Sequence, residues 1–87
     1  MEIFPTLFRV EVNTQSNIGI DLVEVRYFDN LPEAQTTARN ILLQRIREDS
    51  AWEHDVVEVT DQVGKSHLVL MVVGNKETGE LEIEEDP

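Results

Sequence analysis

Carboxylates are the side chains of this sequence with the greatest capacity for chemistry, and they crowd its last nine residues, GELEIEEDP (79–87). On a strand, Glu80, Glu82 and Glu84 would point to one side about 6 to 7 Å apart, which is near the carboxylate separation that glycosidases use. Acid–base catalysis also requires a concave, partly desolvated site, and a terminal strand in a small domain offers none. Calcium binding is disfavoured because no turn wraps these carboxylates around one ion. We therefore interpret them as a surface.

The other groups that could react are few and poorly spaced. His54 and His67 lie on different predicted elements, and neither has another histidine two or four positions away. Asp55, Asp61 and Ser66 lie near these histidines in sequence, but no glycine-flanked nucleophile turn accompanies them. The four glycines are isolated and cysteine is absent, so phosphate-binding loops and thiolate sites are disfavoured. We expect no enzyme, no cofactor and no metal.

The net charge restricts the class of partner. The sequence has 18 Asp and Glu against 7 Lys and Arg, a formal charge of −11. Nucleic acid is bound through cations that displace counterions, so direct binding to it is disfavoured. The charge is also uneven, because residues 44–87 carry twelve acids and four bases, a net −8. We expect the second half to face a basic protein partner.

Length and hydropathy predict one domain and no membrane span. At 87 residues the chain fits a single small acidic domain over residues 1–87. No apolar run approaches the roughly 20 residues that cross a bilayer. Residues 1–5 lack the basic start of a secretory signal, so we expect cytoplasmic residence.

Alternating apolar and polar residues predict two strands in the first third of the chain. The first strand covers residues 6–13 and places Phe8, Val10 and Val12 on one face, with a turn expected over 14–17. The second covers residues 18–28 and is expected to separate two sets of three residues: Val23, Val25 and Tyr27 on one face, Leu22, Glu24 and Arg26 on the other.

A period of three to four residues then predicts one helix over about 31–50. Asn30 can cap it, Glu33 can close a capping box, and Pro32 falls in the first turn, where a missing N–H costs nothing. One apolar stripe is expected to lie on the sheet: Leu31, Ala34, Ala38, Ile41, Leu42 and Ile46. Leu43 lies off this stripe, and Trp52 is expected to close the edge of the core.

Three more strands are predicted after the helix, over residues 55–60, 66–73 and 80–84, the last two joined by a hairpin turn. The run 68–73 is apolar on both faces, which is typical of a central strand. The order ββαβββ predicts an α+β domain, a mostly antiparallel sheet of about five strands with one helix packed on one face. If Val69, Met71 and Val73 lie on the uncovered face, they form a candidate homodimer face.

Two interpretations of the acidic residues remain open. Edge strands and soluble surfaces carry charge for protection, and this explains Glu80, Glu82 and Glu84. A solubilising surface usually mixes both signs, however, and further acids cluster from the helix end to the third strand. The candidate partner-binding set is Glu48, Asp49, Glu53, Asp55, Glu58, Glu80, Glu82 and Glu84. Together these carboxylates could act as a nucleic-acid mimic that occupies a partner's basic groove.

Two resemblances accompany these patterns. The motifs FRVEV (8–12), DNLPEA (29–34) and Asp61-x-x-Gly64 followed by LVL (68–70) resemble a family of small bacterial ββαββ domains of unknown function. The sequence departs from that family at Glu24, where glycine is expected, and in its fifth strand. In size, acidity and lack of cysteine the chain is also similar to phage anti-CRISPR proteins, which implies an inhibitor of a nucleic-acid-binding machine.

The sequence therefore predicts a non-catalytic protein-binding module, most concretely a small acidic inhibitor that occupies a basic nucleic-acid-binding surface. The alternative is a homodimeric accessory domain that uses its apolar sheet face, with the charge serving solubility alone. The two hypotheses differ in salt dependence, because carboxylate-driven contacts weaken in salt and apolar contacts do not.

Overall fold

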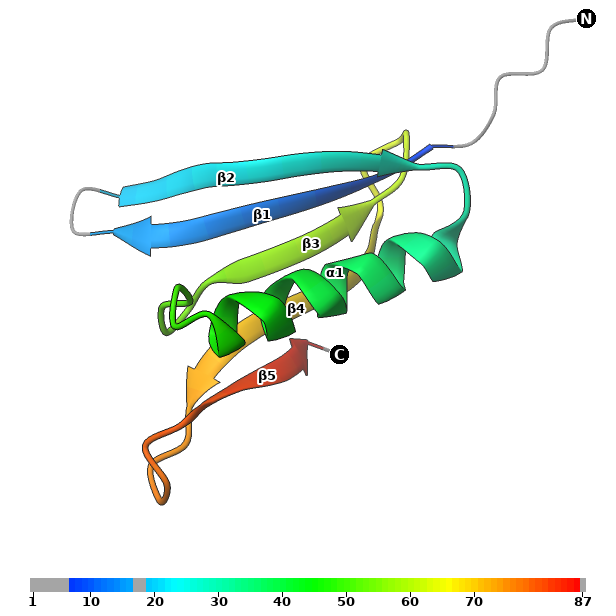
Figure 1. Ribbon diagram of the computed structural model, residues 1–87. Coiled ribbons are helices and arrows are strands. Elements are labelled where there is room, and N and C mark those ends of the chain that lie inside the picture. Colours follow the sequence, from blue (N-terminus) through cyan, green and yellow to red (C-terminus); the bar gives the residue numbers. More distant parts are fainter. Residues whose placement is uncertain (1–6, 17–18, 87) are drawn as a thin grey trace, which may run out of the picture.

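A five-stranded sheet with one helix across one of its faces forms the described part of the chain, residues 7–16 and 19–86 of a computed structural model (Figure 1). The elements are β1 (Phe8–Ser16), β2 (Gly19–Phe28), α1 (Leu31–Arg47), β3 (Val56–Thr60), β4 (Ser66–Gly74) and β5 (Leu81–Asp86). The strands are ordered β2-β1-β3-β4-β5, and every neighbouring pair is antiparallel. The predicted α+β fold and the ββαβββ order are confirmed.

The connection through α1 explains the strand order. The hairpin β1–β2 comes first in the chain, and α1 then runs back across the sheet (Figure 1). β3 therefore pairs with β1, and β2 is left at an edge of the sheet. β4 pairs with β3 on one side and β5 on the other, so its prediction as a central strand is confirmed. β1 is longer than predicted, because residues 14–16 continue the strand in place of the expected turn.

The helix begins as predicted. The backbone N–H of Glu33 donates a 2.8 Å hydrogen bond to Oδ1 of Asn30, and Pro32 lies in the first turn. The Glu33 carboxylate accepts from the Asn30 side-chain amide at 2.9 Å, a side-chain version of the capping box. The helix ends at Arg47, earlier than expected, and Asp49 at φ 57° turns the chain away from the helical path.

The core lies between α1 and the sheet. Ala34, Ala38 and Leu42 are its fully buried helix residues, and the small alanines let the helix backbone approach the strands closely. The strands contribute seven buried residues, Val10, Val12, Val57, Val59, Leu68, Leu70 and Val72. Leu43 is 37% exposed, as its position off the stripe predicts. The prediction that Trp52 closes the core edge was wrong, because this side chain is 67% exposed.

A β-bulge changes the predicted faces of β2. The β1–β2 register shifts between Val12 and Asn13, so Val23 is an extra residue without a directly opposite partner. A bulge puts the alternation on its two sides out of phase. Leu22, opposite Asn13, therefore lies on the face away from α1, whereas Val23 lines a depression beside Ile41 on the helix side. The prediction that Val23 shares a face with Val25 and Tyr27 was wrong.

Candidate protein-binding surface

The sheet face opposite α1, called here the open face, carries an apolar strip. Strand register places Val56 opposite Met71, and both alternate with core residues that point to the helix. Val69 follows on the same face, and Val73 continues it toward the β4–β5 hairpin. The candidate face predicted from Val69, Met71 and Val73 therefore belongs to the side that α1 does not cover.

A shallow depression of about 350 Å³ lies along this strip, lined by Val56, Val69, Met71, Glu84 and Asp86. The strip side chains are half-buried. Apolar groups at its floor and carboxylates at its border suit a ligand that is both apolar and cationic.

Carboxylates surround the strip through cross-strand register. Glu11 of β1 lies directly opposite Glu58 of β3, and Asp86 of β5 lies opposite Val69 in the same row across the sheet. Glu84 lies opposite Met71, and Glu82 opposite Val73. We call this set the open-face carboxylates: Glu11, Glu58, Glu82, Glu84 and Asp86. Glu11 and Asp86 were missed in the sequence because only the strand order brings them into these rows.

The open-face carboxylates are poorly compensated. Like charges directly opposite on a sheet repel, and Glu11 and Glu58 are such a pair. Arg9 contacts Glu11 with an Nη2–Oε2 distance of 3.4 Å, and the Asn75 amide donates to Glu82 at 2.9 Å. Within the described residues, Glu58, Glu84 and Asp86 have no ion-pair partner. Negative charge is therefore left available on this face.

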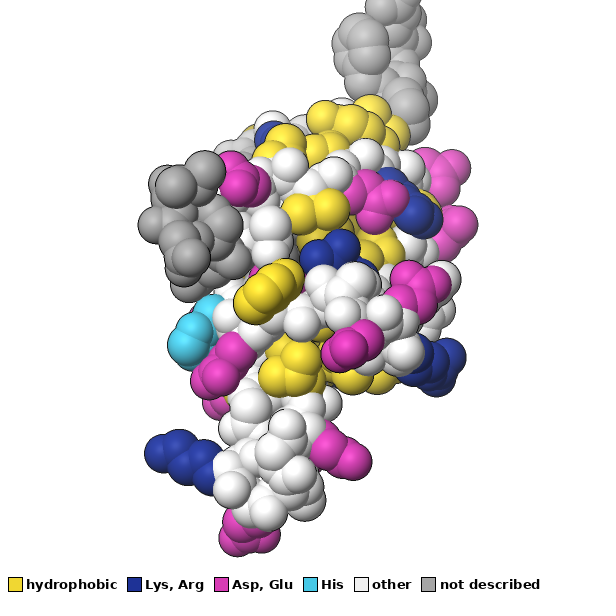
Figure 2. All heavy atoms as spheres, turned by 60° about the vertical axis from the view of Figure 1, so that its left-hand side comes forward, with side chains coloured by type: hydrophobic (Ala, Val, Ile, Leu, Met, Phe, Trp, Pro, Cys, Tyr) yellow, Lys and Arg dark blue, Asp and Glu magenta, His cyan; other side chains and the backbone are white. Residues whose placement is uncertain are grey.

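The other predicted acids lie elsewhere. Glu48 accepts a 3.0 Å hydrogen bond from Gln44 and lines a depression on the helix side. Asp49 and Glu53 lie in the connection from α1 to β3, and Glu80 immediately precedes β5. In a view toward the end of the molecule that holds this connection, acidic side chains are scattered among hydrophobic, basic and other side chains (Figure 2). The predicted set is therefore divided between two regions.

Asp55 cannot belong to a contact surface, because its side chain is fully buried. One carboxylate oxygen accepts from the Thr14 hydroxyl at 2.7 Å, and the other accepts from the Trp52 N–H at 2.9 Å. Arg45 approaches that second oxygen at 3.5 Å and also donates to the Ser50 carbonyl. Asp55 thus fixes the α1–β3 connection against β1. Its predicted role in partner binding is corrected, and no local pattern indicated a partner as remote in sequence as Thr14.

His67 lies near the start of β4, beside the β3–β4 turn. Its Nε2 lies 2.8 Å from Oδ2 of Asp61, and its ring meets the Phe8 ring edge-on at a centroid distance of 5.6 Å. The hydrogen bond with His67, followed by that from the Lys65 N–H, lowers the pKa of Asp61 below its usual value. His54 lies away from this pair, at the other end of β3, and contacts Glu53 at 3.7 Å. These contacts give His67 a structural role in the turn.

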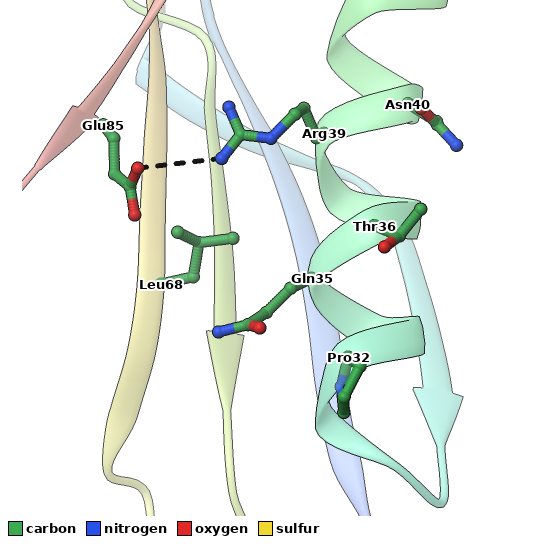
Figure 3. Close-up of a pocket in the computed structure, with 7 residues that line it drawn as sticks. All are labelled: Pro32, Gln35, Thr36, Arg39, Asn40, Leu68 and Glu85. Atoms are coloured by element: carbon green, nitrogen blue, oxygen red, sulfur yellow. Dashed lines mark ion pairs between the residues drawn. The ribbon is translucent and has the colours of Figure 1, made fainter.

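Another depression, of about 320 Å³, lies between α1 and the β4–β5 pair (Figure 3). Arg39 reaches from the helix toward Glu85 of β5, with a nitrogen–oxygen distance of 3.6 Å, above Leu68. Gln35 and Pro32 line its other end. Both charged side chains are about half exposed, and such a pair contributes little to stability. The lining residues include no histidine, serine or cysteine.

No family model, curated protein or solved structure matches this chain. Within residues 7–16 and 19–86, no three His, Asp or Glu side chains gather closely enough to hold a metal ion. The helix in this part of the chain is too short and too polar to cross a membrane.

Proposed function

We propose that this chain is a non-catalytic protein-binding module whose open face contacts a basic protein. The observation that supports this proposal is the arrangement of the open-face carboxylates around the strip of Val56, Val69 and Met71. Lysine and arginine suit such a surface, because their aliphatic stems can cover apolar groups while their charged ends reach carboxylates.

The Glu11–Glu58 pair supports the same proposal. Opposed like charges reduce the stability of the free domain, and a cation placed between them by a partner would remove that repulsion. Relief of the Glu11–Glu58 repulsion then adds to the free energy of binding.

The more specific form of the proposal is an inhibitor that covers a nucleic-acid-binding surface, as anti-CRISPR proteins often do. Carboxylates on neighbouring strands are about 5 Å apart, and those along one strand about 6 to 7 Å apart. A face with carboxylates on three strands therefore approaches the charge density of a phosphate backbone more closely than one strand can. The alternative, a homodimer formed through the open face, must bring these same charges together.

The proposal is tested with two charge-matched variants. The open-face variant combines Glu58→Gln, Glu84→Gln and Asp86→Asn. The control variant combines Glu48→Gln, Asp49→Asn and Glu53→Gln, and it removes the same charge from the α1–β3 connection. The probe is a synthetic peptide of alternating lysine and valine, with a glutamate–valine peptide as the negative control.

We expect the wild-type chain and the control variant to bind the lysine peptide alike, and the open-face variant to bind it at least about tenfold more weakly. Affinity should also fall steeply with added salt. Equal losses in both variants would overturn the assignment of the open face. A natural partner, once isolated, tests whether the chain is an inhibitor of a nucleic-acid-binding surface. If it is, duplex DNA or RNA should compete with the chain for that partner. If the partner is another kind of basic protein, nucleic acid should not compete.

A further inference from the structure

The β2 edge is an exposed, apolar strand edge. Its large hydrophobic side chains are exposed to 69% at Ile20, 54% at Leu22, 45% at Val23 and 63% at Tyr27. β1 pairs with one side of β2, and within the described residues no strand pairs with the other. Such edges accept a further strand unless charge or a bulge protects them. The bulge of β2 lies at Val23, so residues 24–28 form a regular edge segment.

The opposite edge of the sheet is protected. β5 spans residues Leu81–Asp86 and carries four acids within these six positions. β2 spans ten residues, Gly19–Phe28, with only Asp21, Glu24 and Arg26 charged. The difference between the two edges identifies β2 as the one suited to strand pairing.

The charges of β2 complement those of a second β2. Glu24 and Arg26 are two positions apart on one face, with a 2.7 Å ion contact between them. In an antiparallel pair of two β2 strands centred on Val25, Glu24 lies opposite Arg26 of the partner subunit, and the symmetric contact repeats it. Opposite charges in directly facing positions stabilise strand pairs. A two-fold axis at Val25 therefore places two Glu–Arg pairs across the contact between the subunits.

Long-range repulsion favours the same arrangement. Two chains of charge −11 repel wherever their acidic regions meet. Stacked open faces would bring the open-face carboxylates within about 10 Å, whereas pairing at β2 separates the two β5 strands by nine strand spacings, about 43 Å. The Debye length at physiological salt is about 8 Å. Only pairing at β2 keeps the two β5 strands farther apart than the range of their repulsion.

We propose that two copies of this chain associate through antiparallel pairing of their β2 edges, with Val25 at the two-fold axis, into one continuous ten-stranded sheet. Both open faces then lie on the same side of the assembly. The proposal is independent of what the open face binds.

Charge exchange tests the pairing. Sedimentation equilibrium should give twice the chain mass for the wild type at micromolar concentration. Arg26→Glu and Glu24→Arg should each weaken the dimer at least about tenfold, because both facing pairs become like-charged. The double variant Glu24→Arg/Arg26→Glu should restore dimerisation, and an equal mixture of the two single variants should form heterodimers. Circular dichroism of each variant checks that the fold is retained.

Cross-linking tests the register, and the absence of native cysteine makes the result specific. Val25→Cys should form an intermolecular disulfide on mild oxidation, because directly facing side chains on paired strands have Cβ atoms about 5 Å apart. Ile20→Cys, at a more exposed position off the axis, is the collision control and should cross-link more slowly. A monomeric wild type at 100-fold higher concentration, a dimer unaffected by Arg26→Glu, or faster linking at position 20 would each overturn the proposal.

Discussion

The Thr14 hydroxyl donates a 2.7 Å hydrogen bond to the carboxylate of Asp55, a residue 41 positions later in the chain. This bond joins β1 to the connection that leads from α1 into β3. It turns an acidic side chain that the sequence assigns to the surface into a buried structural group, and it determines how the connection is held.

Removal of the Asp55 carboxylate should destabilise the domain strongly. Asp55→Ala leaves the Thr14 hydroxyl and the Trp52 N–H without their acceptors and removes the carboxylate beside Arg45. We expect a loss of about 3 kcal/mol in the free energy of unfolding, measured by urea denaturation. Glu53→Ala, an exposed acid two residues earlier, is the matched control and should change stability by less than about 0.5 kcal/mol. Similar losses in both variants would contradict the structural role of Asp55.

Glycine at position 54 should stabilise the chain. His54 has a φ of 76°, in the left-handed region that costs a residue with a Cβ about 1 to 2 kcal/mol. Glycine removes this cost but is more flexible in the unfolded state, so we expect His54→Gly to gain about 0.5 to 1 kcal/mol in urea denaturation. His54→Ala also loses the imidazole but keeps the Cβ, and should show no such gain. A gain in the alanine variant would assign the effect to the side chain instead.

The Asp61–His67 contact should make stability depend on pH. Because the pKa of Asp61 is lower in the folded chain than its usual 3.8, its carboxylate contributes stability above that value. The contribution is lost as the pH falls through the lower, folded pKa. Unfolding free energies measured by denaturant titration from neutral pH downward should decrease in this window.

Replacement of the histidine identifies the source of that pH dependence. His67→Gln removes the main cause of the lowered pKa of Asp61 and should reduce the acid-induced loss of stability. His54→Gln is the control at an exposed position and should leave the pH profile unchanged. The assignment fails if the two variants have the same profile.

The two adjacent leucines of α1 should differ sharply in their contribution to stability. Leu42 is fully buried against the sheet and Leu43 is 37% exposed. Leu42→Ala should cost about 2 to 5 kcal/mol through lost burial and the cavity that remains, and Leu43→Ala should cost less than about 1 kcal/mol. Thermal and urea denaturation of both variants measure the difference. Comparable losses would place the helix in a different rotation on the sheet.

The order of elements and the rotation of the helix were predictable because they depend on local patterns. The alternation around Val10 and the spacing of Ala34, Ala38 and Leu42 report which side of each element is apolar, whatever lies opposite. The helix start was equally local, since Asn30 and Glu33 interact within one turn. These predictions needed no knowledge of which strands pair.

The membership of the candidate surface was less predictable because it depends on distant segments. The pairing of β1 with β3 sets Glu11 against Glu58, and the pairing of β4 with β5 brings Asp86 beside Val69. The bulge near Val23 exchanged the faces of one half of β2, since one extra residue reverses a period of two.

The sequence by itself determined the strands, the helix and its cap, because each is set by residues close together in the chain. It also determined the excess of negative charge, which depends on composition alone. Only the tertiary structure decided where the carboxylates lie. It buried Asp55, separated Glu48 from the open face, and gathered Glu58, Glu84 and Asp86 around an apolar strip. The physical reason is that a local pattern specifies which side of a strand is polar, whereas strand order and register specify which polar sides become neighbours.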